Sequence, residues 1–275
     1  MKFLAPAKIN LSLRILGKRP DGFHEIESLM VPLSLADDVE IERRDAGGMQ
    51  FACDDPRLPQ GEGNLAFRAA TLFCEAGGFA PNLKIALSKK VPHGAGLGGG
   101  SSDAAAVLLG LNTLFDAGLS REEVSKLGAK LGSDVPFFLC ESAAICRGRG
   151  EVVSPVSLGE QLPLLLLKPP FGVSTPWAYG RWRESKELPG IPYAPQEFPW
   201  GALVNDLERP VFEKYIFLAL LKRWLLGQPE VAGALMSGSG STLFAIARDE
   251  SGACKLAERA AASFEGIWTC VCYIA

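Results

Sequence analysis

Residues 92–103 read Pro92-His93-Gly94-Ala95-Gly96-Leu97-Gly98-Gly99-Gly100-Ser101-Ser102-Asp103. Before them, apolar residues alternate at positions 83, 85 and 87, which predicts a strand; after them, an apolar run over 102–115 predicts a deeply buried helix. Glycines let main-chain N–H groups approach a ligand closely, and a helix N-terminus adds unpaired donors and a positive dipole end. A strand, a glycine-rich loop and a helix in this order predict a phosphate-binding site.

Two other glycine motifs do not fit this stretch. A P-loop requires a Lys before its final Ser or Thr, and no Lys stands there. Gly94, Gly96 and Gly99 match the letters of a dinucleotide-binding fingerprint, but the preceding chain is hairpin-like and no alternating strand–helix pattern follows. The remaining alternative is a glycine cluster that forms tight turns and binds nothing.

Composition limits the class of protein. The chain has 275 residues, of which 48% are hydrophobic and 21% charged, and its net charge is −3. These values are typical of a globular protein and offer no broad basic face for nucleic acid. We expect no membrane span and no signal peptide. The seven cysteines include no Cys-x-x-Cys pair, which favours free thiols in a reducing cytoplasm.

The rest of the chain predicts an α+β fold with largely antiparallel sheets. Alternation over 8–15 and 24–31 around the turn-like Arg19–Gly22 predicts a hairpin with one wet face, which carries Lys8 and Asn10. We expect a Ser120–Glu123 capping box, a helix over 211–226, a turn followed by a strand over 234–247, and an ordered loop or lid over 186–200. The irregular stretch 151–160 suggests two domains, residues 1–155 and 156–275.

Several segments resemble the GHMP kinase superfamily. The stretch 92–102 is similar to its phosphate motif, 6–11 to its N-terminal motif, and 237–241 to its C-terminal glycine motif. Within the superfamily, the chain resembles members that act on a cytidyl-diphosphate-linked polyol, through segments 5–13, 19–26, 63–65, 96–103, 132–138, 148–151, 174–176 and 205–208. The resemblance implies a two-domain α+β fold with the active site in the interdomain cleft. It also implies transfer of the γ-phosphoryl group of ATP to a tertiary hydroxyl with Mg²⁺, by a monomer or weak dimer.

On this resemblance we expect Lys8 and Asp134 to be catalytic. The ammonium of Lys8 would stabilise charge on the attacking oxygen, and the carboxylate of Asp134 would accept the proton of the acceptor hydroxyl. The alternatives are a solvated lysine on a strand edge and an ordinary helix N-cap. Asn10 lies on the same strand face as Lys8 and is expected to contact the acceptor.

The nucleotide is expected to contact the loop residues 92–102, His93 included, and Asn64, whose alternative role is a helix cap. Ser101 and Ser102 could add hydroxyl contacts or ligate magnesium, but we assign no side chain as a metal ligand. Asp103 is expected to interact with the dipole of the following helix.

For the acceptor, we expect Phe23 to stack on the cytosine ring, Tyr179 to cover its other face, and His24 to read its edge. Phe23 departs from the family pattern, where many members carry Tyr, so any phenol hydrogen bond is lost. Two rival hypotheses stay open: another GHMP kinase, such as a homoserine or mevalonate kinase, and a nucleotide-binding regulator without catalysis. The Phe23–His24 pair argues against the first, and the presence of both Lys8 and Asp134 argues against the second.

Overall fold

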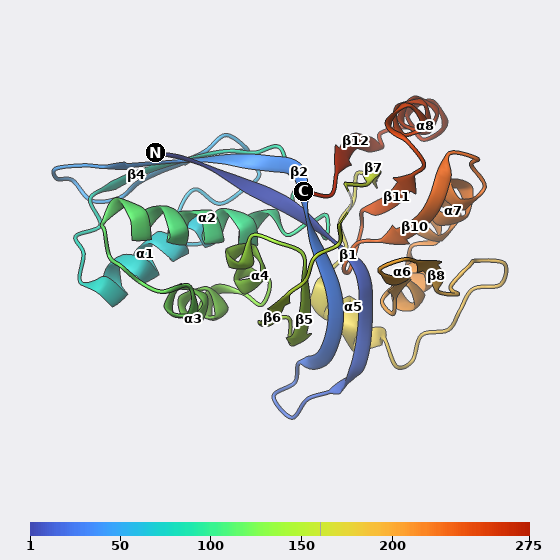
Figure 1. Cartoon of the computed structure of the whole chain (residues 1–275), viewed down its shortest axis with the longest axis horizontal. Coiled ribbons are helices and arrows are strands. Elements are labelled where there is room, and N and C mark those ends of the chain that lie inside the picture. Colours follow the sequence, from blue (N-terminus) through green and yellow to red (C-terminus); the bar gives the residue numbers. More distant parts are fainter. Residues whose placement is uncertain (160) are drawn as a thin grey trace.

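The computed structural model of the protein describes residues 1–159 and 161–275. In this part of the chain the strands form two sheets, one with eight strands and one with four. Helices pack on both sheets, so the predicted α+β class is confirmed. Figure 1 shows the smaller sheet and its helices on one side, and the helices α1–α4 on the other.

A long hairpin organises the larger sheet. β1 (Lys2–Lys18) and β2 (His24–Arg43) pair antiparallel, and the predicted turn joins them. β2 also pairs with β4 (Leu83–Ser88) and β5 (Ala144–Gly148); β3 (Gln50–Cys53) and β6 (Val152–Pro155) complete this side. In Figure 1 the two long strands run from the side of α1–α4 to the middle of the molecule, where the smaller sheet begins.

The prediction that one face of β1 is exposed to solvent is wrong at the centre of the strand. Lys8 is 4% exposed and Asn10 is 1% exposed, although both are polar. The pairing of β1 with β2 shifts register between Pro6 and Lys8 and again between Asn10 and Ser12. The glycine-rich loop also packs on this part of the strand, because the backbone N–H of Lys8 donates to the carbonyl oxygen of Leu97 at 2.9 Å. Two polar side chains are therefore enclosed rather than solvated.

Four helices accompany the larger sheet: α1 (Leu65–Gly77), α2 (Gly99–Leu114), α3 (Arg121–Leu131) and α4 (Val135–Cys140). α2 contacts β1, β2 and the other three helices, which explains why its sequence is apolar on nearly every side. The predicted capping box of Ser120 and Glu123 begins α3. Gly132 follows its last residue, as expected.

The smaller sheet has the order β10 (Val231–Met236), β11 (Leu243–Ala247), β7 (Pro163–Lys168) and β12 (Trp268–Tyr273). α6 (Glu208–Lys214), α7 (Ile216–Leu226) and α8 (Glu250–Ser263) accompany it. The single helix expected over 211–226 is wrong, because Tyr215, at φ −113° and ψ 71°, interrupts it. Residues 234–247 form strand, turn and strand rather than turn and strand.

A short segment of the second half of the chain joins the larger sheet. β9 (Gly201–Asn205) pairs parallel with β1, matching Ser12 with Val204 and Leu13 with Asn205. β8 (Gln196–Phe198) pairs with β9, so part of the expected lid over 186–200 is a strand. The predicted division near residue 155 falls between β6 and β7 and stays a prediction, and Glu160 of the expected boundary lies outside the described residues. None of the helices described is long and apolar enough to cross a membrane.

Candidate active site

A cavity of about 420 Å³ opens between the two halves of the molecule. Residues from both predicted domains, 1–155 and 156–275, line it, and this cavity is the candidate active site. Among the residues expected from sequence, its lining includes Lys8, Asn10, Asn64, Pro92, His93, Gly94, Ala95, Gly96, Leu97, Gly98, Gly99, Gly100, Ser101, Asp134 and Tyr179. Phe23, His24 and Ser102 do not belong to this lining.

The glycine-rich loop reaches the cavity as a tight backbone turn before α2. Gly96 and Gly98 have φ angles of +76° and +73°, which residues with a side chain rarely adopt. A Cβ at Gly98 would lie 2.7 Å from Cζ of Phe138 and 3.1 Å from Cγ of Lys8. α2 begins at the next residue, so its unpaired N–H groups and dipole lie beside the cavity. This geometry can bind a phosphate.

Lys8 and Asp134 meet at the cavity, although 126 positions of sequence separate them. Nζ of Lys8 lies 3.6 Å from Oδ2 of Asp134 and donates to Oδ1 of Asn10 at 2.7 Å. Asn10 in turn donates to Oγ of Ser28 at 2.7 Å, which fixes its orientation. The alternative of a solvated lysine is wrong, because Lys8 is buried. Asp134 does stand at the N-cap position of α4, as the other alternative expects, but its side chain makes no capping hydrogen bond.

Asn64 does cap a helix. Its Oδ1 accepts from the backbone N–H of Ala66 at 3.0 Å at the start of α1, and its Nδ2 donates to the carbonyl oxygen of Pro59 at 3.1 Å. Asn64 also lines the cavity. Any contact that it makes with a nucleotide therefore comes from an amide that the protein already holds in place.

Lys89, between β4 and the loop, has no signal in the sequence that singles it out. Its ammonium pairs with Oδ2 of Asp37, at 2.5 Å, and with Oδ2 of Asp103. Burial alone would lower the pKa of Lys89, but the two carboxylates raise it above its ordinary value. Asp103 was expected to interact with the dipole of α2. Its carboxyl group also contacts Lys89, which that expectation did not include. Lys89 and Asp103 both line the cavity.

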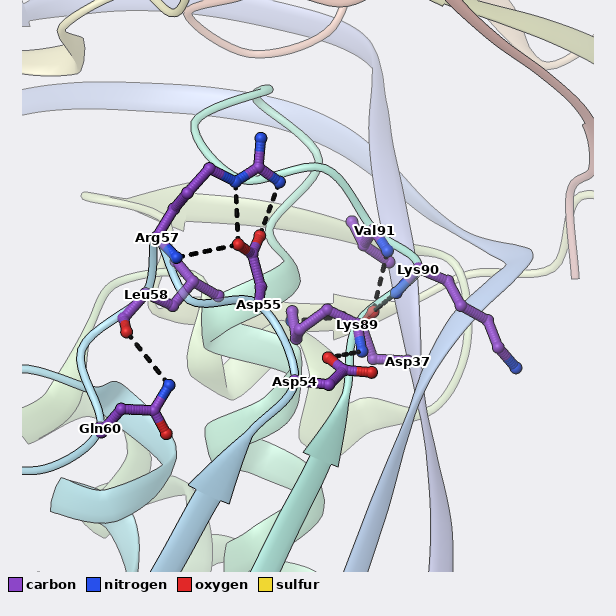
Figure 2. Close-up of polar contacts among 9 residues, drawn as sticks. All are labelled: Asp37, Asp54, Asp55, Arg57, Leu58, Gln60, Lys89, Lys90 and Val91. Atoms are coloured by element: carbon purple, nitrogen blue, oxygen red, sulfur yellow. Dashed lines mark hydrogen bonds and ion pairs between the residues drawn. The ribbon is translucent and has the colours of Figure 1, made fainter.

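Asp37 also holds the backbone that enters the loop. Its Oδ1 accepts from the backbone N–H groups of Lys90 at 2.5 Å and Val91 at 2.8 Å (Figure 2). Asp54 accepts from the backbone N–H of Lys89 at 2.8 Å on the neighbouring segment (Figure 2). The carboxylates thus fix three successive N–H groups just before the glycines.

The segment 54–60 also borders the cavity, to whose lining it contributes Leu58 and Pro59. Arg57 binds the carboxylate of Asp55 through two side-chain nitrogens, at 2.8 and 2.7 Å, as Figure 2 shows. These hydrogen bonds, with one from the backbone of Arg57, lower the pKa of Asp55 to about 2. The ion pair between Arg57 and Asp55 therefore stabilises the turn that carries Leu58 and Pro59 at the cavity edge.

Tyr179 in the cavity wall and the neighbouring His24 are among the aromatic residues expected to bind the acceptor. The rings of His24 and Tyr179 pack with centroids 5.3 Å apart and a tilt of 33°. Phe23 is 50% exposed, and the guanidinium of Arg149 lies 4.6 Å from its ring centroid. Burial, with the charges of Lys18 and Arg183, lowers the pKa of His24. The structure brings Phe23, His24 and Tyr179 into one region, with Tyr179 at the cavity wall.

Several cavity residues had no predicted role: Lys89, Arg149, Thr175, Gly238 and Ser239. Segments 148–151, 174–176 and 237–241 carried the resemblance, so a signal existed for four of them. Thr175 and Ser239 join the two segments of the second half, because their hydroxyl oxygens lie 2.7 Å apart. The place of Lys89 in the cavity wall has no such signal, because it depends on packing alone.

Comparison with known proteins agrees with this geometry. Residues 64–142 match the model of the GHMP kinases N terminal domain, and residues 200–266 match the model of the GHMP kinases C terminal domain. The chain belongs to the GHMP kinase family. The glycine-rich loop of this GHMP kinase lies inside the matched N-terminal region. The turn at 237–241 lies inside the matched C-terminal region, so both segments that resembled family motifs fall within the matches.

Among curated GHMP kinases, the chain is 48% identical to the 4-diphosphocytidyl-2-C-methyl-D-erythritol kinase of Methylacidiphilum infernorum, over 88% of this chain and 84% of that one. It is similar to a crystal structure of 4-(cytidine 5'-diphospho)-2C-methyl-D-erythritol kinase, with a TM-score of 0.81, 36% identity and complete coverage of both chains. A homoserine kinase from Cytophaga hutchinsonii shares the fold, with a TM-score of 0.62 and 20% identity over 100% of this chain and 94% of that one.

Proposed function

We propose that the protein transfers the γ-phosphoryl group of ATP to the 2-hydroxyl of 4-diphosphocytidyl-2-C-methyl-D-erythritol, a step of non-mevalonate isoprenoid biosynthesis. The observation that carries this proposal is the 48% identity with a relative of that name over most of both chains. The cavity supports it, because a phosphate-binding loop and a Lys–Asp pair lie in its wall.

The nucleotide phosphates would lie against residues 96–101. Backbone N–H groups at the first turn of α2 would donate to their oxygens, and the helix dipole would favour their negative charge. The base would lie toward the opposite edge, beside Leu58, Pro59, Leu65 and Val91, which give the cavity an apolar side. The Asp37 contacts keep the entrance of the loop in one conformation before the nucleotide arrives.

Asp134 and Lys8 would carry the chemical step. The carboxylate of Asp134 accepts the proton of the acceptor hydroxyl as its oxygen attacks the γ-phosphorus. Lys8 donates one N–H to Asn10, which holds the ammonium beside the carboxylate, and its charge stabilises the developing negative charge. Phosphoryl transfer depends largely on such positioning and charge stabilisation, so a buried, oriented lysine is well suited to it.

Magnesium fits this site as an ion held mainly by phosphates. Among the residues described, no three His, Cys, Asp or Glu side chains gather to hold a metal. Mg²⁺ in kinases needs only one or two protein oxygens besides phosphates and water, and the hydroxyl of Ser101 lies in the cavity wall. When bound, the ion would neutralise charge on the transferring phosphoryl group.

The acceptor would occupy the end of the cavity formed by Asn10, Tyr179 and Arg149. The lowered pKa of His24, beside Tyr179, favours the neutral ring, which can both donate to and accept from a cytosine edge. Phe23 and Tyr179 offer aromatic surface for the cytosine ring. The guanidinium of Arg149 suits the diphosphate of the acceptor.

An ATP-consumption assay with three acceptors tests this proposal. We expect activity with 4-diphosphocytidyl-2-C-methyl-D-erythritol and none above background with homoserine or mevalonate. Comparable turnover of homoserine or mevalonate would assign the chain to another GHMP kinase activity. ATP binding without turnover of any acceptor would instead favour a nucleotide-binding regulator.

A further inference from the structure

The segment Asn205–Glu208 carries the family resemblance, yet it does not line the cavity. It begins at the last residue of β9 and leads into α6. Two of its side chains, Asn205 and Glu208, are buried and point toward the backbone at the end of β10. That backbone leads directly into the turn 237–241, of which Gly238 and Ser239 do line the cavity.

Asn205 uses its whole amide group in this contact. Its Nδ2 donates to the carbonyl oxygen of Met236 at 2.7 Å and to that of Gly238 at 2.8 Å. Its Oδ1 accepts from the backbone N–H of Leu207 at 2.9 Å, which fixes the orientation of the amide. With Asn205 only 5% exposed, water cannot readily replace these bonds. The amide therefore binds the backbone on both sides of Ser237, at Met236 and at Gly238.

Glu208 also binds the backbone of Met236, at the N–H group rather than at the carbonyl oxygen. Its Oε1 accepts from the backbone N–H of Met236 at 3.0 Å, and its Oε2 accepts from Nζ of Lys222 at 2.5 Å. Burial raises the pKa of Glu208, which the ammonium of Lys222 opposes. Asn205 and Glu208 together thus bind both the carbonyl oxygen and the N–H of Met236.

The turn in its place lies against both the phosphate loop and Lys8. Oγ of Ser237 donates to the carbonyl oxygen of Gly96 at 3.0 Å, and Gly96 has no room for a Cβ against the carbonyl oxygen of Ser237. A Cβ at Gly238 would lie 3.4 Å from Nζ of Lys8 and 3.3 Å from Oδ1 of Asn10. A shift of the turn would therefore move directly against the lysine and the loop.

We infer that Asn205 and Glu208 are positioning residues for phosphoryl transfer, because they hold the turn 237–241 against Lys8 and the phosphate loop. This inference rests on the proposed function, which supplies the reaction. Among the residues described, the two side chains form no hydrogen bond with the loop or the catalytic pair, and they reach the turn through the backbone of residues 236–238. Misplacement of reacting groups by ~1 Å can cost roughly a hundredfold in rate, so a loosened turn is expected to lower kcat.

The first test is Asn205→Asp, which keeps the shape of the side chain but replaces both donors by a carboxylate oxygen. We expect kcat to fall between about tenfold and about a hundredfold, with KM values for ATP and the acceptor within about threefold of wild type. A protonated carboxyl regains one donor, and burial favours protonation. The ratio of variant to wild-type kcat should therefore rise as the pH falls from about 8 to about 6.

Asn112→Asp is the matched control. Asn112 makes the same kind of paired contact, with the backbone N–H and carbonyl oxygen of Leu119, but lies outside the cavity lining. It should lose stability while kcat stays within about twofold of wild type.

The double variant Glu208→Gln, Lys222→Met is the second probe, because it removes the ion pair but leaves an amide oxygen for the N–H of Met236. It should keep more kcat than Glu208→Ala.

Hydrogen exchange separates this inference from the activity itself. In Asn205→Asp, the backbone amides of Ser237 and Gly240, which bond within the turn, should exchange faster than in wild type, while those of α3 do not change. Wild-type kcat in the Asn205→Asp variant, or an equal loss of kcat in Asn112→Asp, would overturn the inference. If wild type lacks the proposed kinase activity, unchanged exchange at the turn would still refute the positioning role.

Discussion

Lys89 and Asp37 form a buried ion pair, with Nζ and Oδ2 2.5 Å apart, at the entrance of the phosphate loop. The side chains are 7% and 0% exposed. A second acidic group, the carboxyl of Asp103 in α2, contacts the same ammonium, so two carboxyl groups share one positive charge in a buried site. Separate elements, β2, α2 and the end of β4, are thereby joined beside the nucleotide end of the cavity.

This arrangement predicts a pH-dependent stability. Burial, and the nearby charge of Asp37, raise the pKa of Asp103 from 3.8 to about 7, against the opposing charge of Lys89. The folded protein thus keeps a proton that the unfolded chain has lost, and its stabilising effect is present below about pH 4 and lost as the pH rises through about 7. Asp103→Asn should flatten the decline of unfolding free energy between those values, as measured by urea unfolding across pH.

The control for Asp103→Asn is Asp45→Asn, since Asp45 is exposed. Wild type and the control should show the same slope of unfolding free energy against pH between about 4 and about 7. The buried carboxylate of Glu208 titrates equally in all three proteins, so the difference between them reports Asp103. An identical slope in Asp103→Asn would show that this carboxyl group does not carry the proton.

Removing either member of the catalytic pair should reduce turnover far more than nucleotide binding. A general base contributes ~10²–10⁴ in rate, and we expect losses of that order for Asp134→Asn. Lys8→Ala removes the ammonium 3.6 Å from Asp134 and should lower kcat comparably. Steady-state kcat and the ATP Kd from calorimetry are the measurements. Lys126→Ala, on the exposed side of α3, is the control, and near-normal kcat in either pair variant contradicts the assignment.

A side chain at Gly98 should obstruct ATP binding. Besides its φ of +73°, a Cβ there would meet Phe138 at 2.7 Å and Lys8 at 3.1 Å. A non-glycine residue in this conformation costs ~1–2 kcal/mol, so Gly98→Ala should raise the ATP Kd by about tenfold or more. Gly78→Ala has a similar φ of +65° but nothing within 4 Å, and it lies outside the cavity lining. It should lower the melting temperature while the ATP Kd stays at the wild-type value.

If Gly98→Ala folds and binds ATP as wild type does, the loop does not receive the phosphates. The comparison with Gly78→Ala matters because both variants carry backbone strain, whereas only one carries it beside the cavity. An equal rise of ATP Kd in both would indicate a general loss of folded protein.

The sequence was most informative where the signal is local. The strand, glycines and helix around 83–115 follow one another in the chain, so their order alone predicts the loop. The capping box at Ser120 is local for the same reason. Pairing Lys8 with Asp134 needed the family resemblance, because no pattern in the chain connects residues so far apart. The oligomeric state and the cytoplasmic location stay predictions.

Features that depend on packing could not be predicted. Lys89 follows an ordinary amphipathic strand, and only the fold places Asp37 and Asp103 around it. The apolar pattern of 211–226 continues through Tyr215, so the break between α6 and α7 has no local signal. The enclosure of Lys8 and Asn10 likewise depends on the loop and on residues of the second half of the chain, which alternation along a strand cannot reveal.

Recognition of the cytidyl group should depend on Tyr179 and Phe23. An offset aromatic contact contributes ~0.5–1.5 kcal/mol beyond buried area, so Tyr179→Ala and Phe23→Ala should each raise KM for the full acceptor by about threefold to about tenfold. The ATP Kd should not change, because the ring contacts described for Phe23 and Tyr179 are with Arg149 and His24 rather than with the glycine-rich loop. Tyr273→Ala, in β12, is the control and should retain wild-type KM values.

A truncated acceptor, methylerythritol phosphate without its cytidyl group, separates base recognition from general damage to the site. Wild type should phosphorylate it poorly, because the contacts of Phe23, His24 and Tyr179 have no base to bind. The two variants should then lose little further activity on it, whereas a variant with a distorted site would lose activity on both acceptors. If wild type uses the truncated acceptor as well as the full one, the base is not recognised, and these aromatic residues have another role.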